Sequence, residues 1–174
     1  MKFLYPILLQ SLLILPFSIS AQTGNSTPCP CCSEDHRAFD FWAGDWEVFK
    51  PDGTPAGSNH IIWLQDSCIL QENWVSATKG YSGTSYNWFD KAENVWRQSW
   101  IDNQGGSLLL SGNPEGNKMV LSSRPLPDGK GGFVINRIIW ANLPDGSVRQ
   151  LWEVSADQGR TWTTAFDGLY KRKS

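Results

Sequence analysis

The sequence predicts an all-β fold: an antiparallel up-and-down β-barrel of eight to ten strands, preceded by a short helix. From Trp46 onward, apolar residues recur with a period of two in about ten short runs. Each run is closed by Gly, Pro, Asn or Asp, and no long helical pattern interrupts them. Strands in direct succession favour an up-and-down barrel, and a two-sheet sandwich is the alternative.

The N-terminal residues are predicted to lie outside this barrel. Residues 1–21 have the form of a signal peptide, with Lys2, an apolar run of roughly 15 residues and small residues ending at Ala21. The run is short for a membrane span, and a retained N-terminal anchor is the alternative. Residues 22–33 form a flexible spacer containing Cys and Pro, and residues 34–174 form a single barrel domain. We therefore expect a periplasmic or secreted protein without a membrane span after signal cleavage.

Four cysteines are expected to form disulfides, because export places them in an oxidising compartment. Cys29, Cys31 and Cys32 form a cluster, and Cys68 lies far along the chain. Directly adjacent cysteines rarely bond to each other, so one of the three, with Cys32 favoured, is expected to bond to Cys68. The alternative is a soft-metal site made by the cluster with His36, but no second Cys-x-x-Cys or His pair completes it. We predict no metal and no cofactor.

A short helix is expected over residues 34–43, with Ser33 as its N-cap and Gly44 as its end. Turn residues then separate the expected strands. These are residues 46–49, 58–65, 69–77, 81–90, 95–102, 108–110, 118–122, 133–141, 148–155 and 161–170. Residues 113–116 are interpreted as a turn. Residues 155–162 match the Asp-box pattern of sialidase propellers, but a single copy indicates a turn and not a glycosidase.

The ten Trp residues require either an extended aromatic core or an aromatic-lined cavity. Three strands place a polar residue two positions before a Trp, so that both point to one face. These pairs are Glu72 with Trp74, Gln98 with Trp100, and Gln150 with Trp152. If those faces point inward, the six residues, together with Arg137, form a small-ligand site. If the Trp side chains instead fill the core, the site is absent, and spacing alone does not decide between these two possibilities.

Other functions receive little support from the sequence. A formal charge of −2 disfavours a nucleic-acid partner. Neither of the two His residues lies near a Ser or Cys in a nucleophile context, so no catalytic residue is predicted. A hydrolase or isomerase would need a carboxylate pair, such as Glu72 and Glu153, to converge inside the barrel. A closed-core module that binds a protein partner is the remaining alternative.

Four segments together carry a resemblance to a known family. They are residues 39–46, 70–74, 96–103 and 149–155, with sequences FDFWAGDW, LQENW, WRQSWIDN and RQLWEVS. From about Arg37 to Lys171 the chain resembles an uncharacterised bacterial family of exported proteins, a domain of unknown function grouped with the calycin (lipocalin-like) barrels. The resemblance implies a calycin-type barrel that binds small apolar or amphipathic ligands, with no assigned activity. It also implies that Arg172 covers Trp46, the Trp of the Gly-x-Trp motif that opens the first strand in lipocalins.

Overall fold

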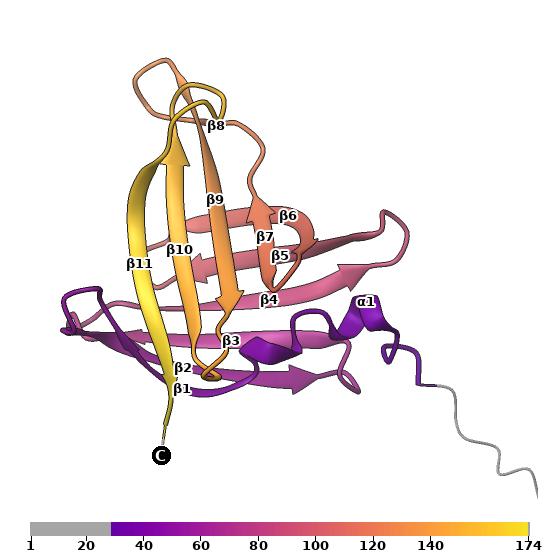
Figure 1. The fold of residues 1–174 in the computed structure, drawn as a ribbon. Coiled ribbons are helices and arrows are strands. Elements are labelled where there is room, and N and C mark those ends of the chain that lie inside the picture. Colours follow the sequence, from indigo (N-terminus) through magenta and orange to yellow (C-terminus); the bar gives the residue numbers. More distant parts are fainter. Residues whose placement is uncertain (1–28, 174) are drawn as a thin grey trace, which may run out of the picture.

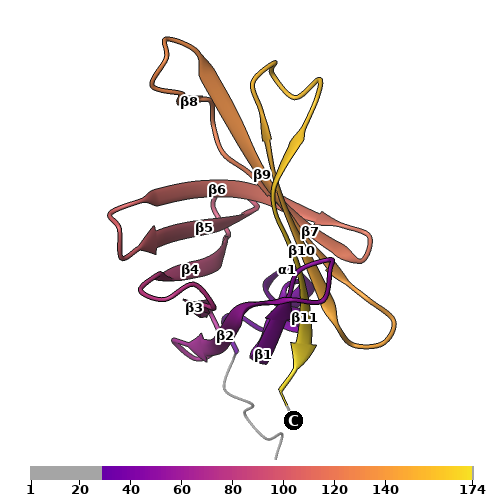
Figure 2. The same cartoon turned by 90° about the vertical axis from the view of Figure 1, so that its left-hand side faces the viewer.

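The computed structural model describes residues 29–173, which form a closed, ten-stranded antiparallel up-and-down barrel (Figures 1 and 2). The predicted all-β fold class is therefore confirmed. The predicted signal peptide, residues 1–21, and most of the predicted spacer, residues 22–33, lie outside the described residues. In Figure 1 the strands near the C-terminus stand side by side and cross those of the N-terminal half.

The barrel strands follow one another around the ring, and the last returns to the first. They are β1 (Gly44–Phe49), β2 (Pro55–Leu64), β3 (Ile69–Ser76), β4 (Ser82–Asp90), β5 (Val95–Asp102), β6 (Ser107–Glu115), β7 (Lys118–Ser122), β9 (Phe133–Asn142), β10 (Val148–Ser155) and β11 (Thr163–Arg172). A two-residue strand, β8 (Leu126–Pro127), pairs with the start of β9 outside this ring. Burial alternates along the strands, as in β3, because each strand has one face toward the lumen.

Strand β6 differs from the prediction, since it runs through the segment interpreted as a turn. Beyond Gly112, β6 has lost its partner β5 and pairs with β7 alone. Pro114 lies in this part, which has a neighbouring strand on one side only. The N–H that proline lacks is therefore not needed for a hydrogen bond between strands. The chain then reverses at Gly116, whose φ of 61° is accessible to glycine without strain.

The expected helix is split into two short pieces, α1 (Glu34–Arg37) and the 3₁₀ turn η1 (Asp40–Trp42). Ser33 is the N-cap, as predicted, and its hydroxyl accepts from the His36 N–H at 3.5 Å. At Phe39, φ of −108° and ψ of 8° interrupt the helical path, which turns its ring into the barrel. Within residues 29–173, no helix has the length and apolarity needed to cross a bilayer.

One end of the barrel is closed by an aromatic cluster. It consists of Phe39, Trp42, Trp46, Trp96 and Trp140, all at most 1% exposed. Phe39 stacks on Trp42 with ring centroids 4.9 Å apart, and Trp140 packs against both rings. The indole N–H of Trp46 donates to the carbonyl of Trp42 at 2.8 Å, which fixes η1 onto the first strand. Each buried ring contributes roughly 2–3 kcal/mol of hydrophobic stabilisation.

The last strand seals this end, as the lipocalin resemblance implies. The Arg172 guanidinium lies 4.1 Å from the centre of the Trp46 ring and donates to the Ala43 carbonyl at 2.7 Å. Gly44 has φ of 132°, and a Cβ there would collide with the Arg172 guanidinium. Glycine is therefore required beside the covering arginine, and the expected Arg172–Trp46 contact is confirmed.

One of two disulfides attaches the N-terminal segment to this closed end, but the predicted pairing of Cys32 with Cys68 is wrong. Cys31 bonds to Cys68, and Cys29 bonds to Cys32. Cys31 is buried against the barrel, whereas Cys32 is exposed and faces Cys29 across a turn, with Cα atoms 5.4 Å apart. Because all four thiols are consumed, the cluster has no thiolate for the alternative soft-metal site.

The Asp-box segment is a hairpin turn between β10 and β11, as predicted. The Asp157 carboxylate accepts from the N–H of Thr161 at 2.8 Å and from its hydroxyl at 2.6 Å. These hydrogen bonds lower the pKa of Asp157 to about 2. The Trp162 indole N–H donates to the Gly159 carbonyl, so the motif closes on itself.

Candidate ligand-binding cavity

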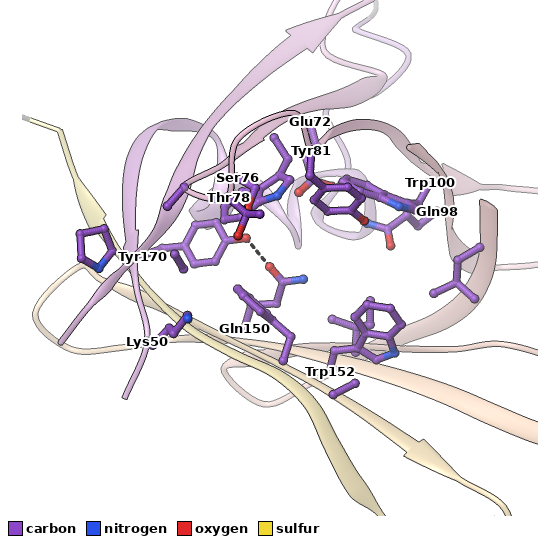
Figure 3. A pocket seen from close by; sticks show the side chains of 18 residues that line it. Lys50, Glu72, Ser76, Thr78, Tyr81, Gln98, Trp100, Gln150, Trp152 and Tyr170 are labelled. Carbon is purple, nitrogen blue, oxygen red and sulfur yellow. Dashed lines mark hydrogen bonds between the residues drawn. The ribbon is translucent and has the colours of Figure 1, made fainter. Parts of the chain in front are cut away.

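The barrel interior opposite the aromatic cluster holds a cavity of about 300 Å³. Its wall is aromatic, and its lining reaches exposed residues at Lys50, Thr78 and Ala165, where the barrel opens to solvent. The wall rings are Trp74, Tyr81, Trp100, Trp152 and Phe166. Polar side chains also line it, and in Figure 3 Gln150 and Tyr170 lie on one side while Glu72 and Gln98 lie on the other.

The cavity stays open because two indoles lie against the barrel wall. The Trp100 ring lies over Gly83, and the Trp74 ring lies over Gly57, so closely that a Cβ on either glycine would overlap the indole. With any larger residue at these positions, the rings would have to move away from the wall. The two glycines therefore create the space that Trp side chains would otherwise occupy.

Glu72 is the carboxylate of the cavity, and it is only 4% exposed. Its Oε1 accepts from the Asn59 amide and its Oε2 from the Ser85 hydroxyl, both at 2.7 Å. Among residues 29–173, no ion pair involves Glu72. Burial raises the pKa of Glu72 to about 7, while the hydrogen bonds from Ser85 and Asn59 oppose that rise. The carboxyl group is thus divided between protonated and ionised forms near neutral pH.

Buried polar side chains form a layer across the barrel between the cavity and the aromatic cluster. Gln98 donates to Asn87 at 2.8 Å, and Asn87 donates to the Ser85 hydroxyl at 2.9 Å. On the other side, the Tyr170 hydroxyl donates to Gln150, and burial and then the charge of Glu72 raise the pKa of Tyr170 well above its usual range. The layer holds the polar groups of the cavity floor in fixed orientations.

Six of the seven predicted ligand-binding residues line the cavity. They are Glu72, Trp74, Gln98, Trp100, Gln150 and Trp152. The structure places all three faces toward the lumen, a direction that spacing alone left undecided, and a ligand-binding role for these residues remains a prediction. The structure combines an open β-barrel lumen with a buried aromatic cluster, an arrangement consistent with a ligand-binding barrel.

Arg137 is the exception, since it does not line the cavity. Its neighbour Ile138 faces the lumen, so the alternation along β9 directs Arg137 outward. There it bonds to Glu153 at 2.8 Å and stacks on the Trp162 ring at 3.8 Å. Because Glu153 is held on this outer face, it does not converge with Glu72 as the hydrolase alternative requires.

Sequence reasoning missed three aromatic residues of the site. Phe166 and Tyr170 lie on β11 with Gly168 between them, and both point into the cavity. Their spacing of four along a period-two strand is the signal that would have identified them. Tyr81 precedes β4, and its hydroxyl donates to Asp102 at 3.2 Å, a contact that the sequence does not indicate.

Comparison with known protein families finds no family model that matches the chain, and comparison with curated proteins finds no matching relative.

Proposed function

We propose that this protein is an exported, lipocalin-like barrel of the calycin group that binds one small, partly apolar molecule in its cavity. The Gly44–Trp46–Arg172 arrangement at the closed end supports the grouping with lipocalins. The signal-peptide pattern of residues 1–21 and the two disulfides support a periplasmic or secreted location.

The observation that carries the binding proposal is the position of Trp100 over Gly83. A barrel with a filled core would direct its large side chains across the lumen, whereas here an indole lies against the wall and leaves space beside it. Apolar walls with a few oriented polar groups are the usual composition of small-molecule sites. The apolar part of the ligand lies between the indoles, and its polar part meets Glu72, Gln98 and Gln150.

Native mass spectrometry of the mature protein, purified from its own exported compartment, tests this proposal. We expect extra mass that disappears when the same sample is denatured. In parallel, the neutral dye N-phenyl-1-naphthylamine should gain fluorescence on binding to ligand-stripped protein. Protein without extra mass that also fails to bind the dye would contradict the proposal.

A matched pair of variants locates the binding site. Gly83→Ala should push the Trp100 ring into the lumen and weaken dye binding, because the added Cβ occupies the place of the ring. Thr84→Ala, on the adjacent outward-facing position of β4, should leave dye binding unchanged. Equal effects of the two substitutions would place the dye outside the cavity.

A protein-interaction role is the second candidate, favoured by apolar side chains on the outer barrel face. Val75, Ile101 and Leu109, on β3, β5 and β6, are 56%, 60% and 65% exposed. An interface on this face predicts that Ile101→Asp abolishes co-purification of a partner with the tagged protein. Unchanged co-purification would exclude this face as the interface.

A further inference from the structure

The floor of the cavity presents a buried carboxylate whose orientation is fixed. Asn59 and Ser85 each hold one oxygen of Glu72 at 2.7 Å, and Asn59 also contacts the Tyr170 hydroxyl at 3.4 Å. Each carboxylate oxygen can accept more than one hydrogen bond. Glu72 therefore retains acceptor capacity toward the cavity that it lines.

The groups that face Glu72 supply no positive charge. Its neighbours on β2 and β4 are Asn59 and Ser85, and the titratable groups that sense its charge are Tyr81 and Tyr170. Burial raises the pKa of both tyrosines, so both hydroxyls are uncharged at neutral pH. Lys50 is the cation among the described lining residues, and it lies on the exposed rim. An ionised carboxylate in this position is costly unless a cation accompanies it.

The aromatic wall favours a cation in the same space. Aromatic faces attract ammonium groups, and the attraction increases when water is excluded. The rings of Trp100 and Trp152 border the cavity from β5 and β10, and Tyr81 enters it from the loop before β4. A cationic group at the floor would thus meet a carboxylate, while an apolar body attached to it would lie among indoles.

Resting on the proposed ligand-binding function, we propose that the ligand is an amine with an apolar body, whose protonated nitrogen binds the ionised carboxylate of Glu72. Asn59 and Ser85 are positioning residues, since they orient the carboxylate without reaching the ligand. Lys50 at the rim disfavours a second positive charge at the outer end of the ligand. A monoamine therefore fits the cavity better than a diamine.

The proposal fixes how affinity depends on pH. The amine needs Glu72 ionised, and a pKa of about 7 leaves about one tenth of the free protein in that form at pH 6 and nine tenths at pH 8. Alkylammonium groups remain protonated over this range. Amine affinity should therefore rise about tenfold from pH 6 to pH 8, and binding at pH 7 should release about half a proton.

Calorimetric titration with tryptamine and its alcohol analogue indole-3-ethanol tests the proposal, at pH 6, 7 and 8 and in two buffers of different ionisation enthalpy. At pH 8 we expect tryptamine to bind at least about tenfold more tightly than the alcohol, with proton release at pH 7. Affinity for the alcohol should change little with pH. Glu72→Gln should remove both the amine preference and its pH dependence, while Glu47→Gln, on the exposed face of β1, should retain them.

The contrary outcomes are distinct. Equal binding of amine and alcohol, or proton uptake on amine binding, would overturn the amine proposal and leave the cavity-binding function standing. Retained amine preference in Glu72→Gln would also overturn it. Failure of both indoles and of the neutral dye would contradict the binding function as well. If Glu72→Gln does not fold, the pH dependence of amine affinity and the proton release on binding, both measured on the unsubstituted protein, still test the amine proposal.

Discussion

Glu72 should make the free energy of unfolding fall as pH rises through neutrality. In the folded protein, burial raises its pKa from the ordinary value of 4.5 to about 7, so the native state holds a proton that the unfolded chain releases. The contribution of Glu72 to the free energy of unfolding is therefore fully present below pH 4.5 and is lost as pH rises through 7. The interval between the two pKa values corresponds to about 3 kcal/mol of unfolding free energy.

Glu72→Gln isolates this effect, because the amide is of the same size and cannot ionise. Its carbonyl oxygen can still accept a hydrogen bond from Asn59 or Ser85. The two proteins should be about equally stable near pH 4.5, and the variant should be more stable by about 3 kcal/mol at pH 8. Comparison of the two is necessary because His36 acts in the opposite direction. Burial and the charge of Lys91 lower the pKa of His36, so its contribution is lost as pH falls below 6.5.

Urea denaturation followed by Trp fluorescence at pH 4.5, 6, 7 and 8 measures both curves. Titration of His36 is common to the two proteins, so it cancels in their difference. Equal dependence of unfolding free energy on urea concentration would show that the denatured states are comparable. A difference between the proteins that stays constant from pH 4.5 to 8, or that decreases, would refute the reasoning about burial of Glu72.

Three further outcomes are expected from the contacts described above. Trp100→Ala should weaken binding of the neutral dye about tenfold or more, a larger effect than its loss of stability, since one face of the ring packs on the wall and the other lines open space; a collapsed fold would contradict this. Gly44→Ala should cost about 1–3 kcal/mol in denaturation experiments, because φ of 132° is strained for alanine and its Cβ meets Arg172. Replacing Cys31 and Cys68 together by Ala should lower the free energy of unfolding by about 3–4 kcal/mol, because this disulfide joins residues 37 positions apart. Replacing Cys29 and Cys32 by Ala should lower it less, because that disulfide joins residues only three positions apart.

The strands could be predicted from the sequence because their signals are local. Alternation and turn residues gave residues 95–102, 118–122 and 148–155, which are the bounds of β5, β7 and β10. The error at Pro114 has a non-local cause. Proline is disfavoured in a strand that is hydrogen-bonded on both sides, which is why Pro114 indicated a turn. In the structure β5 does not extend as far as Pro114, so β6 is paired there with β7 alone. Sequence spacing does not show where a neighbouring strand ends.

The site could be predicted in part, because residues two apart in a strand must share a face. The two-residue spacing correctly predicted that Gln98 and Trp100 share a face. Spacing does not show which face of a strand points into the barrel. Arg137 was therefore predicted to line the cavity, although it lies on the outer face. The openness of the lumen depends on side-chain direction. Whether Trp100 crosses the barrel or lies over Gly83 is decided by packing between neighbouring strands, which the order of residues along one strand does not contain.

The free-energy cost of burying the Glu72 carboxylate is connected with its proposed role in binding an amine. An apolar residue of similar size would avoid the burden of an ionised carboxylate without a cation, and such replacements commonly stabilise proteins. The structure instead fixes the carboxylate with Asn59 and Ser85, so little reorganisation is needed when a cation arrives. A bound ammonium would supply the missing charge and lower the pKa of Glu72. The fall in stability between pH 4.5 and 8 should therefore diminish in the complex, so that an amine stabilises the protein most where the unliganded barrel is weakest.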